Sequence, residues 1–263
     1  MSLAFAADWL SLREPADHRA RSRRVTEAAV ASLAGRRAPL VVDLGCGRGS
    51  NLRYLAPHLP AGTRWRLVDR DRALLTEAAA GQVSVETVVA DLRTADLAGL
   101  VAEADLVTAA ALLDLVDGAW LEALLDAGPR ALLVTGNVDG RIEWQPGHPL
   151  DPAMTAAFLE HHGGDKGFGA ALGVRAPAVL EASVRARGWA VSSEAADWRL
   201  GPSAAALQAA YLAGAVAAIG ETGLPASDLR RWAEARQGWI ERGESRLLVG
   251  HVDLYAQAPA SAG

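Results

Sequence analysis

One short stretch constrains the fold of this chain more than any other. Residues 41 and 42 are apolar and are followed by Asp43. Glycines then occur at Gly45, Gly47 and Gly49, and residues 52–56 are compatible with a helix. Glycine adopts positive φ at no steric cost and lets a backbone approach a ligand closely. The stretch therefore predicts a strand, a tight turn and a helix, with a ligand held at the turn.

A second acid, Asp69, follows the next predicted strand at residues 65–68, where a carboxylate can bind both hydroxyls of a ribose. The turn differs from the dinucleotide-binding spacing G-x-G-x-x-G, because its glycines alternate and Ser50 follows the last of them. Asp43 adds a negative charge that would oppose a pyrophosphate and favour an ammonium or sulfonium group. We therefore expect a nucleoside that carries a positive charge.

These features resemble motif I of the class I S-adenosylmethionine-dependent methyltransferases. Three later segments occur in that family's order: residues 88–92 resemble the third strand with its terminal acid, residues 104–115 resemble motif IV, and residues 129–136 supply a fifth strand. The resemblance covers residues 40–136, with weaker matches to the final pair of strands. An ordered set of motifs is stronger evidence than a glycine turn alone.

The resemblance implies that S-adenosyl-L-methionine is the cofactor and S-adenosyl-L-homocysteine the product. In the family, the first acid lies near the methionine ammonium, the second binds the ribose, and the acid after the third strand binds adenine together with the next amide. The positions that match or adjoin those motifs here are Asp43, Gly45, Gly47, Gly49, Asn51, Asp69, Asp91, Leu92 and Ala110. The segment before the first strand also covers the cofactor in the family, which makes Arg13, Asp17, His18 and Arg21 candidate contacts.

Helical and strand-like segments alternate along the chain, which predicts an α/β fold with both faces of a parallel sheet covered. The resemblance adds an antiparallel last strand. We therefore expect a three-layer sandwich with a seven-stranded, mostly parallel sheet, an N-terminal helical cap and a helical insertion between the last two strands. The predicted helices are residues 15–33, 72–80, 112–126, 176–187, 203–219 and 227–242, and the last two strands are residues 189–194 and 246–255.

We interpret residues 1–258 as a single methyltransferase domain. Its parts are a helical cap at 1–37, a cofactor-binding half at 38–136 and acceptor-side insertions at 137–173 and 201–243. Long insertions at the carboxyl edge of a sheet are where acceptor pockets tend to be built. The tail at 259–263 is predicted to be disordered.

Asp114 is the main candidate for catalysis, because the family often places a polar residue just past motif IV, facing the transferred methyl group. Its neighbours Leu112, Leu113, Leu115 and Val116 are apolar. An acid in that setting should have a raised pKa, which suits a general base near neutral pH. A helix-capping or salt-bridged acid is the alternative.

The insertion after the fifth strand contains a run of polar residues between glycines, from His161 to Gly169. We expect Lys166, with Arg141, to draw an anionic acceptor, while Trp144 and Phe168 cover a flat face and His161 adds a contact. An exposed glycine loop with ordinary polar residues is the alternative.

No metal is expected at this run. Adjacent histidines such as His161 and His162 point in different directions on a helix or a strand, and no clear third ligand is in register with Asp165. His18, His148 and His251 could each accept a proton, and the sequence does not select among them.

From the composition we expect a cytoplasmic protein that does not bind a membrane, and a nucleic-acid partner is disfavoured. Lys and Arg total 26 against 31 Asp and Glu, a formal charge of -5 that argues against nucleic-acid binding. The single cysteine, Cys46, fits a reducing compartment, residues 1–13 lack a secretion signal, and the longest apolar run, 204–219, is too short to cross a bilayer. Trp232 and Trp239, seven residues apart, share one helix face that packs on the sheet or on a second subunit of a homodimer.

Methyl transfer is an in-line displacement, so the protein must align donor and acceptor and, where needed, remove one proton. We expect the chain to methylate an O or N nucleophile of a small molecule. Three alternatives stay open: an RNA or protein acceptor, which an arginine run at 19–24 would serve; a nucleotide-using oxidoreductase, which the glycine spacing disfavours; and a non-catalytic regulator that binds the adenosine cofactor.

Overall fold

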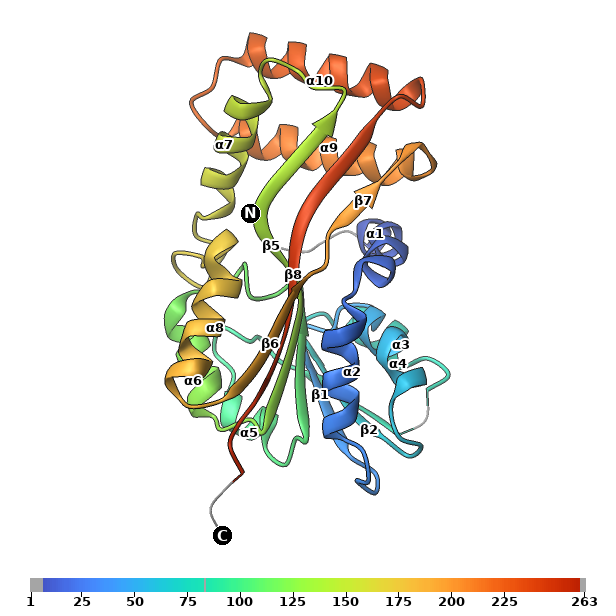
Figure 1. Ribbon diagram of the computed structural model, residues 1–263, viewed down its shortest axis with the longest axis vertical. Helices are drawn as coiled ribbons and strands as arrows, with labels where there is room; N and C mark the ends of the chain where they lie inside the picture. Colours follow the sequence, from blue (N-terminus) through green and yellow to red (C-terminus); the bar gives the residue numbers. More distant parts are fainter. Residues whose placement is uncertain (1–6, 83, 261–263) are drawn as a thin grey trace.

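The computed structural model describes residues 7–82 and 84–260, and its centre is an eight-stranded mixed sheet (Figure 1). The strand order is β3-β2-β1-β4-β5-β8-β6, and β7 also pairs with β8. The strands are β1 (Leu40–Leu44), β2 (Arg64–Asp69), β3 (Val85–Val89), β4 (Leu106–Ala110), β5 (Ala131–Gln145), β6 (Ala190–Ala195), β7 (Trp198–Leu200) and β8 (Arg246–Gln257). Strands β1 to β5 are parallel, whereas β8 is antiparallel to β5, β6 and β7.

Helices cover both faces of this sheet, which confirms the predicted three-layer α/β fold. The helices are α1 (Ala7–Ala20), α2 (Arg23–Ser32), α3 (Ser50–Leu55), α4 (Arg72–Ala79), α5 (Leu97–Val101), α6 (Gly118–Asp126), α7 (Asp151–His162), α8 (Ala176–Ala186), α9 (Ala205–Gly220) and α10 (Ala226–Glu241). One core joins α5, α6 and α8 to a face of the sheet, and another joins α2, α3 and α4 to the opposite face. Strand β1 lies between them and all five of its residues are buried.

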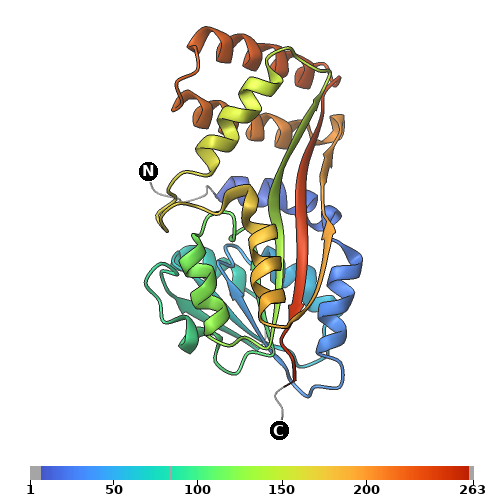
Figure 2. The ribbon, with the colours of Figure 1, turned by 60° about the vertical axis from the view of Figure 1, so that its left-hand side comes forward.

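The sheet continues beyond these layers into a second region. Strands β5 and β8 are 15 and 12 residues long, and their far ends, together with β7, carry α7, α9 and α10 (Figure 2). We call this part the upper region. Its own core contains Trp144, Trp198, Trp232 and Leu247 among others. Trp232 packs edge-on against Trp144 of β5, with ring centroids 6.4 Å apart, so the sheet rather than a second subunit accounts for its burial.

Two predicted helices differ from the observed ones, because a side chain caps the start of a helix inside each predicted range. The helix predicted at 15–33 is divided into α1 and α2, because the Ser22 side chain accepts a hydrogen bond from the amide of Val25 and caps α2. The helix predicted at 112–126 begins only at Gly118, after Asp117 caps the amide of Trp120 at 2.7 Å.

The sheet also differs from the prediction in length and in strand number. Strand β5 continues to Gln145, through the first part of the predicted insertion at 137–173, and polar residues alternate there with Val138, Ile142 and Trp144. The predicted helical insertion between the last two strands begins with the short β7, which makes eight strands rather than seven.

The predictions for the two ends of the chain concern residues that the structure does not describe. Residues 1–6, part of the stretch expected to lack a secretion signal, and 261–263, part of the tail expected to be disordered, lie outside them. One described helical segment, Pro202–Gly220, is apolar and long enough by composition and length to cross a membrane, and 28% of it is buried within the molecule. A core helix of a soluble protein passes the same test, so this is weak evidence.

Candidate functional site

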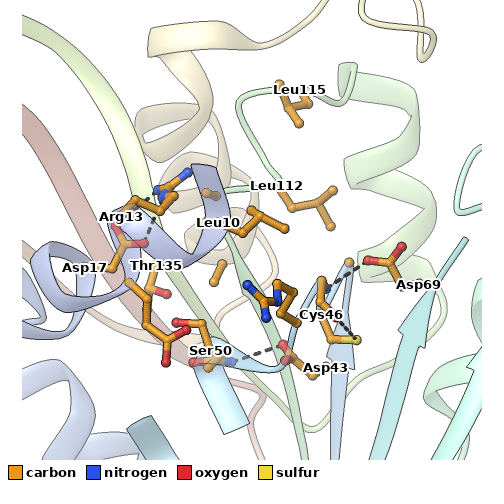
Figure 3. A pocket seen from close by; sticks show the side chains of 18 of the residues that line it. Leu10, Arg13, Asp17, Asp43, Cys46, Ser50, Asp69, Leu112, Leu115 and Thr135 are labelled. Atoms are coloured by element: carbon orange, nitrogen blue, oxygen red, sulfur yellow. Dashed lines mark hydrogen bonds and ion pairs between the residues drawn. The ribbon is translucent and has the colours of Figure 1, made fainter. Parts of the chain in front are cut away.

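A cavity of about 250 Å³ opens at the carboxyl ends of the parallel strands (Figure 3). Asp43 and Cys46 lie on one side of it, Asp69 marks the end of β2, and α1 lies across it through Leu10 and Arg13. Ligands of open α/β sheets bind at this edge, because the loops that follow the strands converge there.

The glycine turn is folded so that its backbone faces the cavity. The amides of Gly45 and Cys46 donate to the carbonyl of Val68 at 2.8 and 3.0 Å, which fixes the turn to β2. Gly49 has φ +76, and a Cβ there would lie 3.0 Å from the Cβ of Ala78. Only glycine therefore lets α3 begin this close to α4.

Asp43 is fully buried at the end of β1. Its Oδ1 accepts from Thr108 Oγ1 at 2.7 Å and from Asn51 Nδ2 at 3.1 Å, but Oδ2 has no partner from any described residue. Burial raises the pKa of Asp43 to about 6, although the two hydrogen bonds and Arg21 oppose that rise. A cation at Oδ2 would complete the site.

Asp69 also lies as predicted, at the tip of β2. Its Oδ2 accepts from the amide of Gly47 and its Oδ1 from the amide of Asp71, both at 2.9 Å. The two amides hold the carboxylate at the cavity edge, and each oxygen keeps further acceptor capacity. Asp71 itself caps α4 by accepting from the amides of Ala73 and Leu74.

Asp91 and Leu92 lie at the cavity beyond the end of β3. Hydrogen bonding to Arg93 lowers the pKa of Asp91 to about 2, so its carboxylate is ionised at neutral pH. The carbonyl of Leu92 accepts from Trp120 Nε1 at 2.7 Å, which fixes the backbone here. Ala110, at the end of β4, lines the cavity as well.

Arg21 contributes the second buried charge of the cavity. Its Nη1 donates to Asn51 Oδ1 at 2.9 Å, and its guanidinium carbon lies 4.4 Å from the ring centroid of Tyr54. Nε and Nη2 are buried and have no hydrogen-bond partner among the described residues, although Asp253 Oδ2 lies 3.5 Å from Nε. Burial lowers the pKa of Arg21, so keeping its side chain charged inside the protein costs free energy.

The unpartnered atoms of Asp43 and Arg21 are complementary to the two ends of an amino acid. Oδ2 of Asp43 can accept from an ammonium, and the Nε and Nη2 edge of Arg21 can bind a carboxylate through two parallel hydrogen bonds. Asn51 joins the two side chains by bonding to both. The residues present therefore fit the methionine part of S-adenosylmethionine.

Of the residues expected to bind the acceptor or act on it, Lys166 and Phe168 line the cavity. Lys166 Nζ donates to the carbonyl of His161 at 2.9 Å, and the Phe168 ring packs edge-on against Trp120. Asp114 does not line the cavity. Its Oδ2 lies 3.1 Å from Nε2 of His162 on α7, which favours the salt-bridged alternative, and its Oδ1 is buried without a partner among the described residues.

The other three expected acceptor residues lie in the upper region or at its border, outside the cavity lining. Arg141 lies within β5 rather than in a loop. Its side chain pairs with Asp139 and Asp197. Trp144 is 6% exposed and belongs to the upper core. His161 lies 3.1 Å from Glu221 after α9. The described residues contain no group of three or more His, Cys, Asp or Glu side chains suited to a metal ion.

Comparisons with known proteins agree with this geometry. Residues 41–136 match a family model described as a methyltransferase domain. A cyclopropane-fatty-acyl-phospholipid synthase-like protein from Lactobacillus casei ATCC 334 is 17% identical, with 97% of this chain and 95% of that chain covered and a TM-score of 0.55. The YcgJ protein from Bacillus subtilis is 10% identical, with 91% of this chain and 100% of that chain covered and a TM-score of 0.54. No curated protein matches the sequence.

At such identities the solved structures show a shared fold, the Rossmann-like arrangement of a mostly parallel sheet between helices. The matched segment spans β1 to the middle of β5 and contains the glycine turn with all three strand-end acids. Residues 41–136 are therefore similar to a methyltransferase domain.

Proposed function

We propose that this protein is a class I S-adenosylmethionine-dependent methyltransferase, with S-adenosylmethionine as its cofactor. It methylates an oxygen or nitrogen atom of a small molecule that enters the cavity beside the bound donor. The observation that carries the proposal is the pair of unsatisfied buried groups, Asp43 Oδ2 and the Nε and Nη2 edge of Arg21. Buried polar groups in proteins are almost always paired, so such a pair in a cavity indicates a ligand that supplies both partners.

The other cavity residues take up the adenosine part of the donor in this proposal. Asp69 receives the ribose hydroxyls, while Asp91 and the backbone at Leu92 receive the adenine. Gly45 and Gly47 bring the backbone of the turn to the donor without a side chain between them. When bound, S-adenosylmethionine supplies an electrophilic methyl group.

The size and walls of the cavity favour a small acceptor over a macromolecule. Leu10, Leu112 and Leu115 lie on the side of the cavity away from Asp43, and α1 borders the cavity (Figure 3). Lys166 and Phe168 add one charge and one apolar ring to the lining of the cavity. This lining limits the access of water to the cavity, which strengthens every polar contact within it.

The single cysteine of the chain, Cys46, supports a reducing cytoplasmic setting for this reaction. Burial raises the pKa of its thiol above the ordinary value, so Cys46 serves as a small side chain in the turn.

Calorimetry of donor binding tests the proposal directly. S-adenosylhomocysteine should bind to the protein, whereas NADH should not, because its pyrophosphate would face the carboxylate of Asp43. A screen of small hydroxyl and amine compounds should then release S-adenosylhomocysteine from the donor. Binding of NADH in place of S-adenosylhomocysteine would disprove the proposed site, and methylation of bulk tRNA alone would disprove the small acceptor.

A further inference from the structure

The cavity continues past the donor's proposed amino-acid site along β8. Asp253 marks the near end, since its carboxylate accepts from the amides of Ser22 and Gly136 and faces Arg21. His251 is the next residue on the same face of the strand, about 7 Å further along. It lines the cavity with Trp198 of β7, and the two ring centroids are 5.1 Å apart. The residues proposed to bind the donor do not include Trp198 or His251.

The ring of His251 is held in one tautomer. Its Nδ1 lies 2.9 Å from the carbonyl oxygen of Val249, and only a protonated Nδ1 can donate to that oxygen. In the neutral ring Nε2 then carries the lone pair, and no described residue bonds to it. The residue is 3% exposed and lines the cavity.

The surroundings keep the ring neutral at physiological pH. Burial lowers the pKa of His251 below its ordinary value, and the charge of Arg13 on α1 lowers it further. Asp17, also on α1, and Asp114 in the loop after β4 act in the opposite direction but do not overcome burial. Arg13 is itself paired with Asp17 at 2.8 Å, which fixes both charges beside the ring.

The other cavity histidine differs from His251. Nε2 of His18 lies 3.1 Å from the carbonyl oxygen of Ser50 and 3.0 Å from its hydroxyl, so it is bonded to the first turn of α3 on the donor side. Its side chain is 28% exposed. His148, the third histidine considered from the sequence, does not line the cavity.

We propose that the end of the cavity formed by Trp198 and His251 receives the methyl acceptor, that the acceptor carries an O–H or N–H proton, and that Nε2 of His251 removes this proton. The acceptor's lone pair forms the new bond to the methyl carbon, the sulfur–carbon bond breaks with its electron pair on sulfur, and the released proton forms the N–H bond at Nε2. The inference rests on the proposed function and adds the class of acceptor and its base.

Nitrogen NMR of the full-length protein saturated with S-adenosylhomocysteine tests the tautomer without an acceptor. In ¹⁵N-histidine-labelled protein, the signal lost in His251→Asn should show a protonated Nδ1 and a bare Nε2 at pH 7. A ring that is charged at pH 7, or that carries its proton on Nε2, would overturn the proposal. Because saturation with S-adenosylhomocysteine is measured first, failure of donor binding separates failure of the proposed function from failure of His251.

Kinetics with an acceptor found in the S-adenosylhomocysteine-release screen tests the base itself. Asparagine at position 251 can still donate to the Val249 carbonyl but has no counterpart of Nε2, so kcat should fall about 10²- to 10⁴-fold while donor affinity is kept. With the donor kept saturating at every pH, the acidic limb of the pH profile of kcat/KM for the acceptor should disappear in the variant. His58→Asn, at an exposed residue outside the cavity lining, should match the wild type. A loss of kcat with the acidic limb intact would assign His251 a structural role and refute the proposal.

Discussion

The cofactor cavity and the upper region each bury an arginine against aromatic rings, and the two arginines differ in their hydrogen-bond partners. Arg236 of α10 is 0% exposed, lies between Trp144 and Trp239, and donates to both oxygens of Asp151 and to the carbonyl of Pro146, which leaves only its Nε without a partner among the described residues. Arg21 lies over Tyr54 and 3.5 Å from Asp253, but its Nε and Nη2 have no hydrogen-bond partner among the described residues.

The difference indicates that the charge of Arg236 stabilises the fold, whereas the charge of Arg21 serves to bind a ligand. A buried ion pair with all its main partners in the chain is part of the fold, and removing one member leaves the other uncompensated. A buried charge whose pairing edge faces a cavity destabilises the empty protein and is compensated when a ligand of opposite charge binds. Each of the following experiments would break or sharpen this contrast.

The largest effect is expected in the upper region. Arg236→Ala should lower the free energy of unfolding by about 3–5 kcal/mol, because Asp151 loses its buried partner. Donor affinity of the protein that remains folded should not change. Denaturant unfolding and calorimetry measure the two quantities. Arg231→Ala, at an exposed arginine of the same helix paired with Asp228, should cost less than about 0.5 kcal/mol. An equal loss in both variants would contradict the structural role of Arg236.

In the cofactor cavity, removing the buried arginine should weaken donor binding rather than stability. Arg21→Met should weaken S-adenosylhomocysteine binding about 10- to 100-fold, since two hydrogen bonds to a carboxylate are lost. Affinity for 5′-methylthioadenosine, which lacks the amino-acid end, should stay the same. Arg23→Met, at a neighbouring arginine whose side chain is 91% exposed, serves as the control and should bind both ligands as the wild type does. If both ligands weakened equally in Arg21→Met, Arg21 would not bind the carboxylate.

Asp43 should make donor binding depend on pH. With its pKa raised to about 6, the carboxylate is mostly protonated at pH 5, so S-adenosylhomocysteine should bind about tenfold more weakly there than at pH 7. The dependence should be absent with 5′-methylthioadenosine and in Asp43→Asn. Calorimetry between pH 5 and pH 7.5 measures it, and a flat profile in the wild type would exclude Asp43 as the partner of the ammonium.

The same raised pKa predicts how the stability of the protein without donor depends on pH. Because the folded state keeps the proton of Asp43 from the ordinary pKa of 3.8 up to about 6, stability from this group is fully present below pH 3.8 and decreases as pH rises through that window. The total decrease is at most about 3 kcal/mol. Saturating donor should oppose it above pH 6, where the ionised carboxylate gains a cation.

The smallest effect is expected where the two regions meet. Trp198→Phe removes the hydrogen bond of 2.9 Å from the indole Nε1 to Asp17 Oδ1, which fastens α1 to β7. The free energy of unfolding should fall by about 1 kcal/mol. Trp9→Phe is the matched change, since Trp9 is only partly buried beside Trp198, and it should cost less. A larger loss at Trp9 would show that ring contacts, rather than the hydrogen bond, hold α1 in place.

The cofactor-binding half could be predicted from the sequence because its constraints are local. The turn needs glycine at fixed spacing, and an acid at the end of each of three parallel strands lies at one edge of the sheet wherever the rest of the chain goes. Asp43, Asp69 and Asp91 were therefore placed at the cavity without any knowledge of long-range contacts, and the structure brings them together.

The upper region was not predicted with the same success, because its residues acquire their roles from distant parts of the chain. Trp144 was interpreted as an acceptor contact in a loop, yet it lies in β5 and packs on Trp232, 88 positions later. The alternation of Val138, Ile142 and Trp144 with polar residues was the available signal for a strand. His251 could not be selected from the sequence, because its environment includes Arg13 and Asp17, more than 230 positions earlier.

Strands β5 and β8 pass without a break from one core of the molecule into the other, with ten paired positions along their length. No flexible linker divides these two strands into halves that could melt apart. Heating should therefore disrupt both cores in one cooperative transition, and a probe on α10 should report the same midpoint as a probe beside the donor. Differential scanning calorimetry that resolved two separate heat-absorption peaks would show that the paired strands do not join the two cores into one unit.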